Sequence, residues 1–150
     1  MATITRFEDI EGWRRARELA RSIYLLSADG SFSRDYAFRD QVRRAAVSIM
    51  ANVAEGFGRG GNREFIQFLG HARGSCAELK SHLYLARDAN YISEENFASL
   101  YKLAAEIEKL ISGLMRYLNG TDHRGAKFKS TVNSTPRVTR TEPQEPRAEL

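Results

Sequence analysis

Apolar side chains recur three and four residues apart along most of the first 120 residues, which is the spacing of amphipathic helices. The pattern predicts four helices, at about residues 7–26, 35–55, 62–90 and 93–118. No segment alternates cleanly between apolar and polar positions, so no strand is expected. All three prolines lie in the last 15 residues, which leaves the four helical stretches uninterrupted. The predicted fold class is therefore all-α.

Turn and cap residues mark where these helices should begin and end. Asp29-Gly30-Ser31 breaks the first, and the segment Gly56-Phe-Gly-Arg-Gly-Gly61 ends the second. Asn62 is a suitable N-cap for the third helix, and Ser93 is one for the fourth. Because the connections are short, neighbouring helices should be antiparallel, giving an up-down-up-down four-helix bundle over residues 1–120. Residues 121–150 are poor in apolar side chains and are expected to form a flexible basic tail.

Composition narrows the function classes further. The chain has 150 residues, 42% of them apolar and 28% charged, with a net charge of +4. No stretch is long and apolar enough to span a membrane and the start lacks a signal-peptide pattern, so a cytoplasmic location is expected. The single cysteine, Cys76, falls on an apolar helix face and is expected to be packed rather than nucleophilic. No metal-ligand or catalytic motif was found, so we expect no enzyme activity, no cofactor and no metal.

A polar stripe follows the second helix beside its apolar face. Facing positions on the third helix are also polar, and the two stripes suggest a network that fixes helix packing or assembly. Its predicted members are Gln41, Arg44, Ser48, Asn52, Glu55, Ser75 and Glu78. Within it, Arg44 is expected to pair with a carboxylate, and Glu78 is the first choice. Ordinary solvated helix edges, or a ligand site, remain alternatives for the same pattern.

Arginines are the candidate nucleic-acid contacts, because the guanidinium group binds phosphate in a bidentate manner. The predicted set is Arg14, Arg15, Arg21, Arg39, Arg43, Arg59 and Arg63. The alternative is that neighbouring carboxylates neutralise them as surface ion pairs. The sequence shows no aromatic platform in a nucleic-acid motif, so stacking on bases is not expected.

Two of the predicted helices carry more apolar surface than one bundle core needs. The first has Leu19, Leu25 and Leu26, and the third has Ile66 and Tyr84 on a second face. This surplus predicts self-association. A broad core face is the alternative explanation.

A combination of motifs resembles a known family. Gln41-Val-Arg-Arg-Ala-Ala-Val-Ser-Ile, Asn52-Val-Ala-Glu-Gly56 and Phe65-x-x-Phe-Leu, followed by Ala72-Arg-Gly-Ser75 and Glu78-Leu79, are similar to the four-helix-bundle proteins encoded in intervening sequences of bacterial 23S ribosomal RNA genes. The resemblance covers roughly residues 8–118. One departure is Met50, which stands where the family often has proline.

That family is structurally similar to the accessory variability determinant proteins of diversity-generating retroelements, which are pentamers that bind a reverse transcriptase and nucleic acid. The resemblance therefore implies a homopentamer with an RNA-related role. The function expected first is a non-enzymatic, oligomeric accessory protein that binds RNA or DNA through phosphate contacts. The alternative is a protein-interaction scaffold, for example an accessory subunit of a reverse transcriptase.

Overall fold

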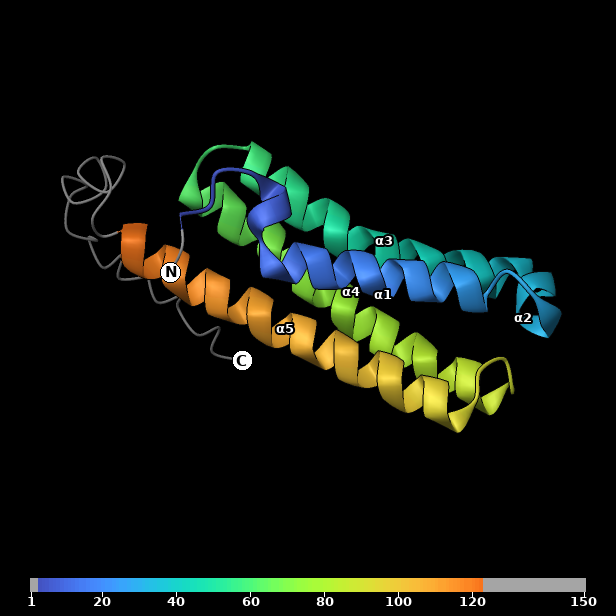
Figure 1. Ribbon diagram of the computed structural model, residues 1–150. Coiled ribbons are helices and arrows are strands. Elements are labelled where there is room, and N and C mark those ends of the chain that lie inside the picture. The colour runs from blue at the N-terminus through green and yellow to red at the C-terminus, as the bar shows by residue number, and fades with distance from the viewer. Residues whose placement is uncertain (1–2, 123–150) are drawn as a thin grey trace, which may run out of the picture.

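The computed structural model describes residues 3–122, and four long helices form its framework (Figure 1). These helices are α1 (Glu11–Leu26), α3 (Tyr36–Gly58), α4 (Asn62–Asp88) and α5 (Glu94–Asp122). A 3-10 turn, η1 (Phe7–Asp9), precedes α1, and a short helix, α2 (Gly30–Arg34), connects α1 to α3. Residues 123–150 of the expected tail lie outside the described residues.

The long helices pack antiparallel, each against two neighbours. Helix α1 packs against α3 and α5, and α4 packs against the same two, so α3 and α5 stand diagonally across the bundle. This confirms the predicted all-α antiparallel bundle. No helix within residues 3–122 is long and apolar enough to cross a membrane.

The core contains the apolar positions that the helical spacing predicts. Ile49, Leu79 and Ile107 are completely buried, and so is Leu19 of α1, which sequence reasoning placed in the surplus apolar surface. Burying a side chain of this size contributes about 1.5–3 kcal/mol, so this shared interior is the main stabilising term of the bundle. Helix α3 runs without a break through Met50, as expected for a position without proline.

The glycine-rich segment between α3 and α4 was only partly predicted. Helix α3 does not end at Gly56 but continues to Gly58, so the connection is only residues 59–61. Gly56 is buried inside the helix, where a Cβ atom would lie 2.7 Å from the Cβ of Phe68. This glycine therefore serves the close approach of α3 and α4. The turn itself uses Gly60, whose φ of 78° suits a residue without a side chain.

The start of α4 also differs from the prediction. Gly61 occupies the N-cap position, and Asn62 is the first helical residue, without a capping bond from its side chain. Its amide instead donates to the carbonyl of Leu118 at 3.4 Å and to the hydroxyl of Thr121 at 3.2 Å. Asn62 thus ties α4 to the last turns of α5. The predicted Ser93 cap is confirmed, because its Oγ accepts a hydrogen bond from the backbone N–H of Asn96 at 3.0 Å.

An aromatic cluster closes the end of the bundle where α2 lies. Phe32 of α2, which sequence reasoning did not place in a helix, is 2% exposed and stacks on Tyr91 and Phe38 with ring centroids 5.3 and 5.9 Å away. Asp35 joins this cluster to the start of α3. One of its carboxylate oxygens accepts from the N–H of Phe38, and the other accepts from the hydroxyl of Tyr91 at 2.7 Å. The start of α3 is therefore held from two sides.

The apolar surplus predicted on the first and third helices is smaller than expected. Leu19 lies in the core, and Leu26 and Ile66 are partly buried against it. Leu25 and Tyr84 do remain exposed, at 63% and 46%. These two positions, on α1 and α4, are what remains of the surface from which self-association was predicted.

Candidate nucleic-acid interface

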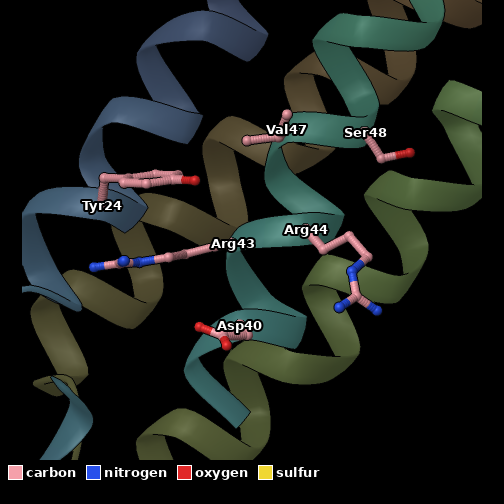
Figure 2. Close-up of a pocket in the computed structure, with 6 residues that line it drawn as sticks. All are labelled: Tyr24, Asp40, Arg43, Arg44, Val47 and Ser48. Atoms are coloured by element: carbon pink, nitrogen blue, oxygen red, sulfur yellow. The ribbon is translucent and has the colours of Figure 1, made fainter. Parts of the chain in front are cut away.

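An open pocket of about 440 Å³ lies against α3, beside the last turns of α1 (Figure 2). Its lining residues are Tyr24, Asp40, Arg43, Arg44, Val47 and Ser48. All but Tyr24 come from α3, on three successive turns of that helix. The two arginines leave α3 in different directions, so the pocket carries one guanidinium group on each side.

Arg43 is held against the end of α1. Its Nε donates to the hydroxyl oxygen of Ser27 at 2.8 Å, and its guanidinium carbon lies 4.5 Å from the centre of the Tyr24 ring. The Ser27 hydroxyl in turn donates to the carbonyl of Ile23 in the last turn of α1. A positive charge at a helix C-terminus is favourable. Arg43 is thus positioned by a neutral hydroxyl and a ring, and no carboxylate in the part of the chain that the structure describes pairs with it.

Arg44 extends toward α4 and is exposed. It makes no hydrogen bond or ion pair with any residue between 3 and 122, so the predicted pair with Glu78 is wrong for the single chain. Glu78 lies instead 3.2 Å from the Nε2 of His82, one turn further along α4. Glu78 and His82 are four residues apart on the same face of α4, so their side chains meet readily. Arg44 lies on a different helix.

Asp40 is the one carboxylate among the lining residues, and it is engaged elsewhere. It pairs with the Nε of Arg39 at 3.0 Å, while Arg39 also donates to the carbonyl of Ser33. The guanidinium of Arg39 lies 4.9 Å from the centre of the Tyr36 ring. The pocket therefore keeps a positive charge from Arg43 and Arg44, with a second arginine–tyrosine pair beside it.

The other predicted arginines do not gather at this pocket. Arg14 donates to the carbonyl of Glu8, and Arg15 is bound by Glu18 and by Glu106 of α5, whose hydrogen bond raises the pKa of Arg15. Arg59 pairs with Glu55 at 2.9 Å. The alternative interpretation, in which neighbouring carboxylates pair with the arginines at the surface, is therefore correct for Arg15, Arg39 and Arg59. Arg21 and Arg63 are exposed and have no ion pair within the described part of the chain.

The predicted polar network is reduced to three side chains at the seam between α3 and α4. The hydroxyl oxygens of Ser48 and Ser75 lie 2.9 Å apart, and the Asn52 amide donates to the Ser48 oxygen at 3.0 Å. The Ser75 hydroxyl also lies 3.2 Å from the carbonyl oxygen of His71, to which it donates. The remaining predicted members, Gln41, Arg44, Glu55 and Glu78, do not join this group.

Sequence reasoning missed the two tyrosines of this surface. The side chain of Tyr24 is 45% exposed, and that of Tyr36 is 65% exposed. The guanidinium group of Arg39 lies over the Tyr36 ring, and that of Arg43 lies over the Tyr24 ring. A signal was present for one of them, since Tyr36 and Arg39 are three residues apart and share a helical face. The contact between Tyr24 and Arg43 joins two helices and has no local pattern.

A second basic cluster lies on α4 and α5, away from the pocket. Arg73, Lys109 and Arg116 line a smaller depression of about 230 Å³ together with Ser112 and Glu108. Glu108 is paired with Lys80 at 3.0 Å. None of the residues lining this depression is aromatic. This distinguishes it from the α1–α3 surface, by which we mean the pocket with Tyr24 together with the neighbouring pair of Tyr36 and Arg39.

The remaining candidate chemistry is structural. Cys76 is completely buried, as predicted, and burial raises the pKa of its thiol to about 12. A thiol in that state is not a nucleophile at neutral pH. Within residues 3–122, no group of three or more His, Cys, Asp or Glu side chains is placed to hold a metal ion.

Fold and surface together define an antiparallel helical bundle with an arginine- and tyrosine-bearing pocket on the α1–α3 side. Residues 8–113 match the 23S rRNA-intervening sequence protein family, and the chain belongs to that family. A crystal structure of a protein of unknown function from the S23 ribosomal protein family, from Bacteroides thetaiotaomicron, is similar in fold, with a TM-score of 0.64 and 24% identity. The match covers 70% of this chain and 95% of that one. No curated protein matches the sequence.

Proposed function

We propose that this protein is a non-enzymatic, oligomeric accessory protein of the cytoplasm that binds nucleic acid through phosphate contacts. The observation that carries the proposal is the pocket in which Arg43 and Arg44 have no carboxylate partner among residues 3–122. Arginines whose charge is not neutralised offer the strongest phosphate contacts on a protein surface. The name of the family, which refers to 23S ribosomal RNA, favours RNA as the ligand.

The test is a salt series of RNA binding for the parent protein and for Arg43→Gln/Arg44→Gln. Phosphate-driven affinity should fall steeply between about 50 and about 200 mM salt. The double variant should bind at least about tenfold more weakly, and its logarithmic salt slope should be shallower by about 1–2. Fluorescence anisotropy with a labelled RNA measures both quantities.

A matched control removes the same charge from the second basic cluster. Arg73→Gln/Arg116→Gln should leave affinity within about twofold of the parent, since these arginines lie on α4 and α5. Equal losses in the two double variants would show that binding follows overall charge and has no site at the pocket. A parent protein without salt-sensitive binding would reject the proposed function.

Self-association is the second part of the proposal, with a pentamer as the expected assembly. Its support is the exposed apolar surface that remains on the bundle, above all Leu25 and Leu85, which are 63% and 55% exposed. Sedimentation at micromolar concentration should give a species several times the 17.0 kDa chain mass. A clean monomer at that concentration would contradict this part.

The same exposed leucines also suit the alternative function, in which the bundle is a scaffold for another protein such as a reverse transcriptase. The arginine and leucine variants distinguish the two functions. A scaffold would keep its partner after Arg43→Gln/Arg44→Gln and would lose it after Leu25→Ser/Leu85→Ser, whereas the nucleic-acid function predicts the reverse for RNA.

A further inference from the structure

We infer that the α1–α3 surface selects single-stranded over double-stranded nucleic acid, with bases stacking on Tyr24 and Tyr36. This inference rests on the proposed function and names the ligand class of the same pocket. It comes from two arginine–tyrosine pairs that lie side by side along α3.

The rings are available to a ligand. Tyr36 is 65% exposed and Tyr24 is 45% exposed, so solvent reaches a large part of each side chain. Each guanidinium group lies close to its own ring, at 4.9 Å for Arg39 and 4.5 Å for Arg43. Figure 2 shows the guanidinium of Arg43 extending alongside the Tyr24 ring.

The spacing of the two pairs suits consecutive units of one strand. Arg39 and Arg43 are four residues apart on α3, which places them about 6 Å apart along the helix axis. Arg39 is paired with Asp40, whereas Arg43 and Arg44 have no ion pair within the described residues. Phosphates should therefore bind at Arg43 and Arg44, while the neighbouring rings offer flat apolar surface to the bases.

A duplex cannot use these rings. In double-stranded DNA or RNA the base faces are already stacked inside the helix, and a protein reaches only base edges and the backbone. Single strands expose base faces, and aromatic side chains bind them with little sequence preference because every base has such a face. The two tyrosines thus add affinity for single strands only, on top of a phosphate term that both ligands share.

The experiment compares labelled RNA of about 16 nucleotides as a single strand and as a duplex, with the full-length parent and the variant Tyr24→Leu/Tyr36→Leu. We expect the parent to bind the single strand at least about fivefold more tightly than the duplex. The leucine variant should lose about tenfold or more for the single strand and should bind the duplex as the parent does. Tyr24→Phe/Tyr36→Phe keeps both rings and should keep single-strand binding within about twofold.

The controls separate the possible failures. Tyr117→Leu removes a tyrosine of similar exposure, 42%, on which no arginine is stacked in the described residues, and it should leave both affinities unchanged. Thermal unfolding followed by circular dichroism shows that each variant is folded, and the phenylalanine variant tests stacking if leucine at Tyr24 displaces Arg43.

Three results overturn the inference: tighter binding to the duplex, unchanged single-strand binding in the leucine variant, or equal losses for both ligands. In each of these cases salt-sensitive binding through Arg43 and Arg44 would still stand. Absence of binding to both ligands would reject the proposed function itself, and the inference with it.

Discussion

Gly56→Ala should lower the free energy of unfolding by about 1–3 kcal/mol, although alanine is a better helix former than glycine. The added methyl group would lie 2.7 Å from the Cβ of Phe68, 3.1 Å from the Phe65 ring and 3.3 Å from the Phe65 carbonyl oxygen. The first and last of these atoms are a side-chain stem and backbone, so they move only if α4 moves away from α3. Urea unfolding measures the change.

Gly74→Ala is the matched control, and its effect should have the opposite sign. Gly74 is also inside a helix, α4, but a Cβ there would meet no atom within 4 Å. Its replacement should therefore raise stability by about 0.5–1 kcal/mol through helix propensity alone. Destabilisation by both alanines, or by neither, would contradict the close approach assigned to Gly56.

The fold was predictable because it depends on spacing. Residues that recur at helical intervals, such as Leu79, Leu83 and Ile107, are the ones that the structure buries. The incorrect predictions concern residues whose role depends on a contact with another helix. Asn62 looks like a cap from its neighbours in sequence, but it bonds to α5, more than fifty residues away. Gly56 looks like a helix terminator, whereas the two phenylalanines of α4 determine its role.

The candidate site was less predictable for the same reason. A helical wheel shows that Arg15 and Arg43 are both polar-face positions, but it cannot show what each meets. Arg15 finds Glu106 at 2.6 Å on α5, whereas Arg43 finds a serine and a tyrosine on α1. Among residues 3–122, only the second has no carboxylate partner. Whether an arginine is paired with a carboxylate therefore depends on contacts between helices, which a helical wheel does not contain.

Asp35→Ala should destabilise the protein by about 1–3 kcal/mol, because one side chain makes two attachments. It accepts from the N–H of Phe38, which caps α3, and from the hydroxyl of Tyr91 beyond the end of α4. The first turn of α3 carries Tyr36 and Arg39, so loosening this turn should also weaken single-strand binding. Asp35→Asn retains the capping oxygen, and it should be the milder of the two variants.

The bond between Tyr91 and Asp35 also predicts a dependence on pH. Hydrogen bonding to the Asp35 carboxylate, together with burial, raises the pKa of Tyr91 above its usual value of 10.0. A raised pKa in the folded state means that this stabilisation is fully present below about pH 10 and is lost as the pH rises through the folded value, when the hydroxyl can no longer donate. The parent should therefore be more stable than Tyr91→Phe at about pH 8, and the difference should shrink toward about pH 11, as measured by urea unfolding at each pH. A difference that stays constant across this range would show that the phenol does not donate to Asp35 in solution.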